Sequence, residues 1–459
     1  MRIVVLNGSP KGSRSVTLQY VHFIEKNFPQ HAFRIFNVAQ QIKGIERDEA
    51  LFREITGEVR EADGVLWAFP LYVFLVSAQY KRFIELITER KAEDAFRGKY
   101  AAVLTTSIHF FDHTAHAYLR GICDDLGMKH AGSFSADMYD LLQEGMRDRL
   151  KLFAMHFFEA IERRLPAPRA YPPVAARPFE YLPGSAGPAL DAGGKRVVLL
   201  TDSSAAGTNL GRMIDRIAHS FSRGIEVIDL NAVAIKGGCM GCLQCGYDNT
   251  CAYGDQDSYR EFYDSRIKTA DILLYAGTVK DRYLSSRWKL FFDRSFYNTH
   301  KPTLAGKQLG VLISGPLGQL PHLRQILEAY AEWQQAHLVD FVTDESGDSA
   351  AIDSLLDSLA GQLVRFSASG YVKPPTFLGV AGMKIFRDDI WGRFRFPFLA
   401  DHEFYKERGA YDFPHKNYPS RIANALLLLL ARIPPMRREI YKKRMKEEMI
   451  KPLKKVLEK

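Results

Sequence analysis

The sequence contains few cysteines, and most of them lie together. Of five cysteines in 459 residues, four fall between positions 239 and 251, and the fifth is Cys123. Thiols this few and this clustered do not make a disulfide framework in a chain of this length, and they suit a reducing compartment. The spacing therefore points to chemistry at one loop.

Long hydrophobic runs are also lacking. The most apolar stretch, residues 422–433, contains Asn424 and Arg432 and is too short to span a bilayer. Met1 leads directly into an apolar, strand-like segment without the basic and apolar regions of a secretory signal. These features predict a cytoplasmic protein.

Most of the chain carries little net charge. The formal charge is +9, and residues 432–459 contribute +7 of it, from eleven Lys or Arg against four Glu. A basic helical tail can lie on a membrane surface or pack on an acidic partner, although most such helices are simply solvated. We expect no nucleic-acid partner, and surface contact of the tail with a membrane stays open.

Apolar runs alternate with helical patterns through residues 1–164. Five strands are expected in segments 2–6, 31–38, 64–69, 100–106 and 130–136, and helices begin near Ser13 or Ser15 and cover 47–62, 77–89, 113–126 and 145–164. This alternation predicts a doubly wound α/β domain with a five-stranded parallel sheet. Its ligand site should lie at the carboxyl ends of the strands, in segments 7–17, 69–77 and 105–112.

The same pattern restarts after a proline-rich segment. Residues 165–195 contain seven prolines and no periodicity, which predicts a linker, and residues 196–370 then repeat the strand–loop–helix order. A helix is expected over 257–269. Residues 371–459 form a C-terminal appendage and basic tail, of which 371–414 should be extended or short-helical and should pack over a sheet edge or a partner's ligand site.

The loop after the first strand is a predicted anion site. It reads GSPKGSRS, and hydroxyls of Ser9, Ser13, Ser15 and Thr17 together with helix N–H groups can hold a phosphate. It is neither a Walker loop nor a GxGxxG fingerprint. An ordinary strand-to-helix turn with a serine cap is the alternative.

This loop, together with ADGVLWAFPLYVFLVSAQYKRFIELI (residues 62–87), resembles the NADPH-dependent FMN reductase family of flavodoxin-like proteins. The resemblance implies a flavodoxin-like domain that binds FMN, and the repeated pattern predicts a second such domain in tandem; FMN in both domains stays open. It implies a phosphate site and a ring site, the latter beside a Pro-x-Tyr loop, although Tyr72 could instead be a core residue. The implied cofactor-binding residues are Ser9, Ser13, Ser15, Thr17, Pro70, Leu71, Tyr72, Val73, Thr106 and Ser107.

The loop after the fourth strand is rich in histidine. His109 is an open candidate for a flavin-edge or proton-transfer role, while Asp112 is a natural N-cap for the next helix. A metal site is less favoured because no further ligand completes the set. Cys123 fits a half-buried structural thiol.

The remaining cysteines, Cys239, Cys242, Cys245 and Cys251, are predicted metal ligands. Two-residue gaps turn three sulfurs toward one point, which suits a [4Fe-4S] cluster; redox thiols, zinc and inert buried thiols stay open. The surrounding segment, 196 to about 300, resembles the iron-sulfur flavoprotein branch of the same family. It departs by lacking Gly-Ser-Pro and by carrying Lys280, Asp281 and Arg282 in place of Pro-x-Tyr.

The expected function is a flavin-dependent NAD(P)H oxidoreductase. Electrons would pass through FMN, in the first domain, and a [4Fe-4S] cluster, in the second, to a quinone, flavin or protein acceptor. A quinone or nitro reductase with non-catalytic cysteines is one alternative. A non-catalytic electron carrier or redox sensor is another, and a homodimer remains open.

Overall fold

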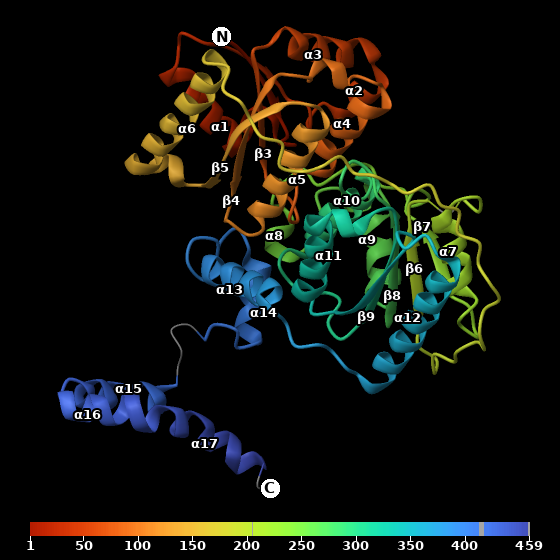
Figure 1. The fold of residues 1–459 in the computed structure, drawn as a ribbon, viewed down its shortest axis with the longest axis vertical. Helices are drawn as coiled ribbons and strands as arrows, with labels where there is room; N and C mark the ends of the chain where they lie inside the picture. The colour runs from red at the N-terminus through yellow and green to blue at the C-terminus, as the bar shows by residue number, and fades with distance from the viewer. Residues whose placement is uncertain (204, 413–416, 458–459) are drawn as a thin grey trace. The chain divides into compact units, whose positions relative to one another are not determined.

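The computed structural model of the protein describes residues 1–459 except 204, 413–416 and 458–459. The chain forms two compact units, residues 1–404 and 405–459. The first unit contains two parallel sheets with helices packed on them (Figure 1). Within the described residues, no helix is both long and apolar enough to cross a membrane.

The first sheet has five parallel strands in the order β2-β1-β3-β4-β5, the doubly wound order of flavodoxin-like proteins. β1 and β3 are almost entirely buried because their continuous apolar runs face helices on both sides. The strands are β1 (Arg2–Asn7), β2 (Ala32–Phe36), β3 (Gly64–Pro70), β4 (Tyr100–Ser107) and β5 (Lys129–Asp137).

Helices cover both faces of this sheet. Side chains of α1 and α6 form the core on one face, and those of α3, α4 and α5 form it on the other. The expected helix over 47–62 is divided, because Asp48 caps a new helix by accepting from the N–H groups of Ala50 and Leu51. The helices are α1 (Val16–Asn27), α2 (Ile42–Arg47), α3 (Glu49–Glu61), α4 (Ala78–Glu89), α5 (Asp112–Asp125) and α6 (Glu144–Glu162).

The second sheet repeats the topology, with the order β10-β9-β8-β6-β7. The single helix expected over 257–269 is wrong in form: a four-residue helix, α9 (Tyr259–Phe262), widens into a π-helical turn over Tyr263–Ile267. That turn accompanies a bond between the Tyr263 and Thr303 hydroxyls. The other elements are β6 (Val197–Thr201), α7 (Asn209–Ala218), β7 (Glu226–Asp229), α8 (Cys245–Asp248), β8 (Ile272–Thr278), α10 (Ser286–Ser295), β9 (Gln308–Ser314), α11 (Pro321–Trp333), β10 (His337–Thr343) and α12 (Ser349–Ser369).

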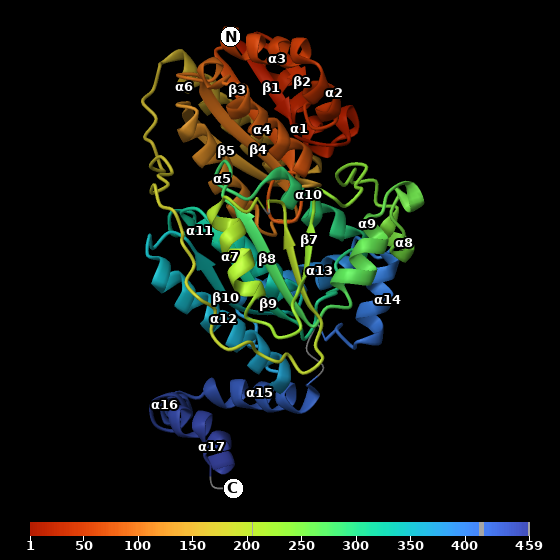
Figure 2. The same cartoon turned by 90° about the vertical axis from the view of Figure 1, so that its right-hand side faces the viewer.

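A continuous hydrophobic core joins the two sheets. It includes Phe83 and Leu119 from the first half and Trp288, Phe291 and Tyr330 from the second. Helices α4, α5, α10 and α11 therefore lie between the sheets, as Figure 2 shows. The two halves form one compact unit because they share this core.

Residues 371–404 are more ordered than expected. Instead of an extended or short-helical segment, the chain forms α13 (Phe377–Trp391) and enters α14 (Leu399–Glu407). Thr376 caps α13 and bonds Glu332 of α11, and Gly379 and Gly382 allow close approach to Glu332 and Phe110. Helix α13 forms because it packs against α11, a tertiary contact that periodicity alone did not reveal.

The C-terminal unit is helical. It contains α15 (Tyr418–Ala431), α16 (Pro434–Arg438), a π-helical turn (Glu439–Arg444) and α17 (Met445–Leu457). Helix α15 ends before Pro434, whose fixed backbone suits a helix start.

Candidate functional site

A cavity of about 350 Å³ lies at the carboxyl ends of the strands of the first sheet. We call it the sheet-edge cavity. Its size is at the lower end of the range of small-molecule sites, and its wall is mostly apolar with a few hydroxyls. Eight of the predicted cofactor-binding residues line it: Ser9, Ser15, Pro70, Leu71, Tyr72, Val73, Thr106 and Ser107.

The loop after β1 is held open for a ligand by its own hydrogen bonds. The Asn7 amide donates to the Gly12 carbonyl at 3.2 Å and to Asn37 at 2.8 Å. Gly12 has φ +56°, and a side chain there would also strike Gln40. Ser15 is the N-cap of α1 but makes no side-chain capping bond, so its buried hydroxyl is available to a ligand at the helix N-terminus.

Two other predicted phosphate residues lie elsewhere. The Ser13 side chain is exposed, and Thr17 is fully buried with its hydroxyl 2.6 Å from that of Thr106. Neither residue lines the sheet-edge cavity. Thr17 therefore orients the hydroxyl of Thr106, which does line the cavity.

The loop after β3 holds an unusual backbone conformation. Val73 and Phe74 have φ of 33° and 67°, which is costly for residues with a β-carbon. A backbone bridge between Tyr72 and Leu75 fixes the turn, and the Lys289 ammonium donates to the Tyr72 carbonyl at 2.9 Å. Strain of this kind is held in place at ligand sites by the surrounding structure.

His109 does not line the sheet-edge cavity. Its Nδ1 lies 3.0 Å from the Asp112 carboxylate, which also accepts from the Ser135 hydroxyl at 2.6 Å. The expected N-cap role of Asp112 is wrong, since α5 begins at Asp112 and Phe111 occupies the cap in a left-handed conformation. The structure thus gives His109 a surface hydrogen bond and no place at the cavity wall.

Cys123 is fully buried, not half-buried as expected. Burial raises the pKa of its thiol far above the ordinary value. This cysteine is a core residue of α5 and stays protonated.

The cysteine loop encloses a second, small cavity of about 30 Å³, lined by Cys239, Cys242, Cys245 and Cys251. We call it the four-thiol cavity. Burial, with smaller contributions from the neighbouring thiols, raises the pKa of Cys239 and of Cys245 to about 12. All four cysteines of the loop therefore line one cavity.

The four-thiol cavity carries one buried positive charge. Arg294 of α10 is only 2% exposed and pairs with Asp257 at 2.6 Å. One of its nitrogens lies 3.9 Å from the Cys251 sulfur, and its guanidinium stacks on the Tyr253 ring at 4.2 Å. Arg294 therefore places a fixed cation where thiolate charge would collect.

Among the described residues, no group of three or more His, Cys, Asp or Glu side chains is placed to hold a metal ion. A zinc ion needs its sulfurs about 2.3 Å from one point, whereas a cubane cluster is ligated at separate iron corners. The donor set, four thiols beside one guanidinium, is chemically suited to iron and sulfide.

The two cavities meet at the cysteine loop. Cys239 lines both of them, and Gly241 and Leu243 also line the sheet-edge cavity. The Gln79 amide donates to the Cys239 carbonyl at 3.0 Å, and any side chain at Gly241 would collide with the Tyr72 hydroxyl. The cysteine loop of the second domain therefore packs directly on the loop after β3 in the first domain.

Sequence reasoning missed part of the sheet-edge cavity. Its remaining wall comes from distant segments, including Phe386 and Ile390 of α13, Phe394, Phe398, and Trp333 of α11. The aromatic content of residues 371–414 had predicted that this segment packs over a sheet edge, and Phe394 and Phe398 do line the cavity, whereas Trp333, Phe386 and Ile390 were not singled out. Lys11, Met138 and Tyr139 also line the cavity and had no distinguishing sequence pattern.

The matching edge of the second sheet is filled by the chain itself. Asp344, beside Ser314, accepts from the Ser314 hydroxyl and the Gly315 N–H at 2.7 Å and from the Asn209 amide at 2.9 Å. Asn209 also bonds the linker, accepting from the Tyr181 N–H and donating to the Phe179 carbonyl. A fixed carboxylate at the N-terminus of α7 thus occupies the place where the first domain offers an anion site.

The charged residues that replace Pro-x-Tyr face the first domain. Arg282 pairs with Asp125 through two bonds of 2.5 and 2.7 Å, and Lys280 bonds Glu89 at 2.5 Å. Asp281 accepts from the Thr88 hydroxyl at 3.1 Å. These charges therefore serve the contact between the domains.

Residues 1–139 match the model of the NADPH-dependent FMN reductase family. Solved structures with a similar fold include an apo NADH:FMN oxidoreductase (22% identity, 34% of this chain and 87% of that chain, TM-score 0.30). Another is an FMN-dependent NADH-azoreductase from Bacillus anthracis in complex with FMN (15% identity, 36% of this chain and 98% of that chain, TM-score 0.26). A third is a flavoenzyme NAD(P)H:(acceptor) oxidoreductase from Paracoccus denitrificans (14% identity, 34% of this chain and 97% of that chain, TM-score 0.26).

A search of curated proteins found no match. The family match ends in the first domain and leaves the second parallel sheet unassigned. The similarity to the NADPH-dependent FMN reductase family is therefore a property of residues 1–139, the first domain.

Proposed function

We propose that this protein is a flavin-dependent NAD(P)H oxidoreductase in which FMN in the first domain exchanges electrons with a [4Fe-4S] cluster in the second. The observation that carries the proposal is the position of Cys239, which lines both the sheet-edge cavity and the four-thiol cavity. A flavin and a cluster held in adjoining cavities would lie close enough for electron transfer within one chain.

The first domain supplies the groups that FMN requires. The buried hydroxyls of Ser9 and Ser15 at the start of α1 would hold the phosphate, and Thr106 and Ser107 offer further polar contacts. Pro70 to Val73 would border the ring, with Tyr72 fixed by Lys289. When bound, FMN supplies the ability to accept a hydride and to release electrons singly or in pairs.

The second domain would supply the cluster ligands. Cys239, Cys242, Cys245 and Cys251 surround a common cavity, and Arg294 provides a compensating positive charge beside Cys251. Helix α13 and the aromatic residues after it cover the sheet-edge cavity and would keep water from the flavin. The acceptor would be a quinone, a flavin or a protein, and thiolate ligation suits the reducing cytoplasm.

The test is to purify the protein anaerobically, record its absorbance spectrum, and measure flavin, iron, zinc and sulfide per chain. About four iron and four sulfide with one FMN, and a broad shoulder at roughly 400 nm, are expected. Flavin without iron after anaerobic reconstitution would contradict the cluster and leave a simple FMN reductase.

Variants separate electron transfer from structure. Cys239→Ser should lower the iron content and slow acceptor reduction while FMN is retained, whereas Cys123→Ala, in the core of α5, should leave iron unchanged. Unchanged turnover in Cys239→Ser would instead favour a cluster with a sensing or structural role.

A further inference from the structure

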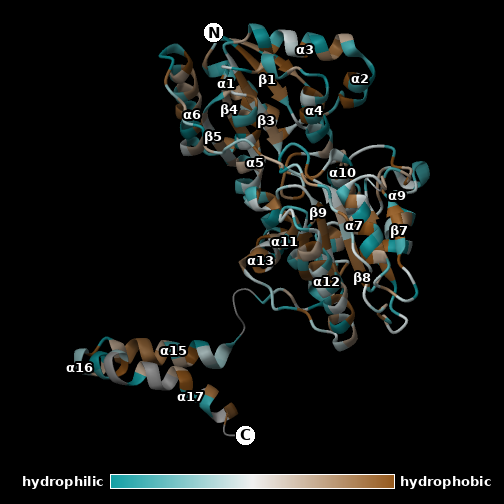
Figure 3. Cartoon of the chain, turned by 45° about the vertical axis from the view of Figure 1, so that its right-hand side comes forward, coloured by the Kyte–Doolittle hydropathy of each residue, from teal (hydrophilic) through white to brown (hydrophobic). Residues whose placement is uncertain are grey.

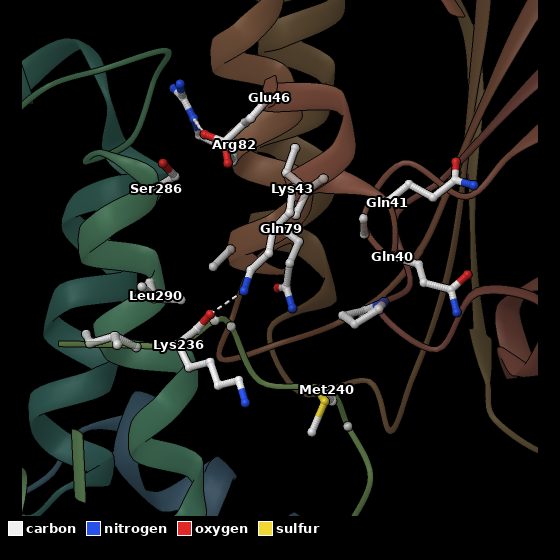
Figure 4. A pocket seen from close by; sticks show the side chains of 18 of the residues that line it. Gln40, Gln41, Lys43, Glu46, Gln79, Arg82, Lys236, Met240, Ser286 and Leu290 are labelled. Carbon is white, nitrogen blue, oxygen red and sulfur yellow. Dashed lines mark hydrogen bonds and ion pairs between the residues drawn. The ribbon is translucent and has the colours of Figure 1, made fainter. Parts of the chain in front are cut away.

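A much larger cavity, of about 1220 Å³, lies between the two domains on the other side of the cysteine loop. We call it the interdomain cavity. Its wall comes from the loops after β1 and β2, from the first turns of α4 and α10, and from residues 231–242 (Figure 4). It adjoins the carboxyl edge of the first sheet, and Lys11 and Gly241 line both this cavity and the sheet-edge cavity.

The wall of the interdomain cavity is strongly cationic. Six basic side chains line it against one carboxylate, that of Glu46: Lys11, Arg14, Lys43, Arg82, Lys236 and Arg287. Arg82 is neutralised by Glu46, Glu85 and Glu89. In the part of the chain that the structure describes, the other five have no carboxylate within ion-pair distance.

Local hydrogen bonds leave this excess positive charge in place. The Lys43 ammonium donates to the Lys236 carbonyl, Lys236 bonds the neutral amide of Gln256, and Arg287 donates to the carbonyls of Leu230 and Val233. Carbonyl and amide partners orient a cation without cancelling its charge. Five like charges around one space repel one another, and an anionic ligand would relieve that repulsion.

The rest of the wall is polar. Gln40, Gln41 and Gln79 come from the first domain and Asn231 from the second, and Figure 4 shows Gln79 beside Lys43. Amide side chains can donate to and accept from sugar hydroxyls and base edges. The cations are spread along both walls, so several anionic groups could be bound at once.

We infer that the interdomain cavity binds a nucleotide bearing at least two phosphate charges. Its volume is ample for a ligand of that size, and Lys and Arg are the residues that bind phosphate. The exposed thiol of Cys242 also lines this cavity, so the ligand would bind next to the four-thiol cavity. The inference does not require iron at the cysteines.

The test uses full-length, FMN-loaded protein, so that the phosphate loop of the first domain is already filled. Isothermal titration calorimetry with NADP⁺, and separately with inorganic pyrophosphate, should show binding that weakens as salt is raised. The double variant Lys43→Glu/Lys236→Glu should weaken NADP⁺ binding at least tenfold without loss of flavin. Both residues are exposed, so the fold should tolerate the change.

A matched control makes the same charge change elsewhere. Lys26 of α1 and Arg149 of α6 are exposed and lie outside the interdomain cavity, so Lys26→Glu/Arg149→Glu should change affinity less than twofold. Two results would overturn the site. One is an equal loss of NADP⁺ affinity in both double variants, and the other is that neither NADP⁺ nor pyrophosphate binds. Because flavin and iron are measured separately, failure here is distinguishable from failure of the electron-transfer proposal.

A second, independent feature lies in the C-terminal unit. Every residue from 417 to 430 is exposed, although α15 carries five consecutive leucines, Leu426 to Leu430, and Ile422 (Figure 3). Soluble proteins rarely expose contiguous apolar surface of this extent. An exposed apolar surface of this extent marks an interaction site.

The charge of the neighbouring sequence indicates what covers it. Residues 432–459 carry eleven Lys or Arg against four Glu. Arg437 and Arg438 follow α15 almost directly, in the last turn of α16. An apolar helix followed by a basic segment is the pattern of a segment that lies in the plane of a bilayer with anionic lipids.

We propose that the C-terminal unit docks on an anionic lipid surface, with α15 in the boundary between headgroups and acyl chains. Full-length protein should co-sediment with vesicles containing phosphatidylglycerol and much less with pure phosphatidylcholine vesicles, and salt should weaken the binding. Leu427→Gln/Leu428→Gln should reduce binding at least tenfold, whereas Leu355→Gln, an exposed leucine of α12, should not.

A second copy of the chain is the competing occupant of α15. Light scattering after size-exclusion chromatography measures the mass of the protein in solution and so detects a dimer. A dimer that dissociates in Leu427→Gln/Leu428→Gln, without vesicle binding by the parent protein, would overturn the lipid proposal.

Discussion

The two α/β domains share one topology but treat the same sheet edge in opposite ways. In the first, β4 ends in Thr106 and Ser107 at a cavity that Ser9 of the loop after β1 also lines, and Ala136 lies beside Thr106. In the second, Asp344 lies beside Ser314, and the linker packs over the edge through Tyr181. One acidic residue and one stretch of linker therefore decide which copy is open to an anionic cofactor.

At their contact, by comparison, the domains are nearly symmetric. Ser77 caps α4 and Ser285 caps α10, and each helix presents a Lys four residues before an acid. The Ala78 N–H donates to Asp293 at 2.7 Å, and the Ser286 N–H donates to Glu85 at 2.6 Å. The two domains thus pair through equivalent helix starts, although their sheet edges differ.

The largest effect should come from breaking one side of this contact. Lys289 and Asp293 are both fully buried and paired with each other, so Asp293→Ala leaves an uncompensated ammonium and an orphaned N–H. We expect a loss of about 3 to 5 kcal/mol in the free energy of unfolding, measured by urea denaturation.

The equivalent pair on α4, Lys81 and Glu85, is the control. After Glu85→Ala, Lys81 still has Asp281 at 3.7 Å, so the loss should be smaller. Combining Lys289→Met with Asp293→Leu should recover much of the stability, because no buried charge is then left unpaired. Equal losses for Asp293→Ala and Glu85→Ala would mean that the two sides are equivalent.

Acid should weaken the domain contact through His322. This buried ring of α11 lies beside Tyr118 of α5 and donates to the Arg282 carbonyl at 2.7 Å. Burial lowers the pKa of His322 from 6.5 to about 4, so the folded chain excludes a proton that the unfolded chain accepts. Stability is therefore unaffected above pH 6.5 and falls as pH drops toward 4, by at most roughly 3 kcal/mol.

The measurement compares His322→Asn with the parent protein in urea denaturation at pH 7.5 and 4.5. Between pH 7.5 and 4.5, the parent protein should lose more free energy of unfolding than the variant. A gap that does not change with pH would show that His322 carries no linked proton.

The fold was largely predictable from the sequence, because apolar runs that alternate with amphipathic segments leave few other arrangements. Pro70 to Val73 were singled out from the sequence through the Pro-x-Tyr pattern, and they line the sheet-edge cavity. Packing of residues 371–414 over a sheet edge was expected from their aromatic content, but the particular residues Phe386 and Ile390 were not predictable, because they are selected by contacts between segments about 300 residues apart. For the same reason, the role of Asp344 became evident only when its place beside Ser314 was known.

The next prediction compares the two phosphate loops directly. Ser15 and Thr208 are the N-caps of α1 and α7, and Asp is an equally good cap at either position. Ser15→Asp should repel the phosphate and weaken FMN binding at least tenfold, or about 1.4 kcal/mol, whereas Thr208→Asp should leave it unchanged. Fluorescence titration of the apoprotein with FMN measures both, and equal weakening would place flavin in both domains.

The smallest effect concerns the linker that covers the second edge. The Tyr181 hydroxyl bonds Asp353 of α12 at 2.5 Å, and the tyrosine is fully buried. Because Asp353 keeps the Gly184 N–H and Arg216 as partners, Tyr181→Phe should cost only about 1 kcal/mol, and exposed Tyr418→Phe should cost almost nothing. FMN should stay at one per chain in Tyr181→Phe, since Asp344 still occupies the second anion site. A second FMN per chain would show that the linker, and not Asp344, closes that site.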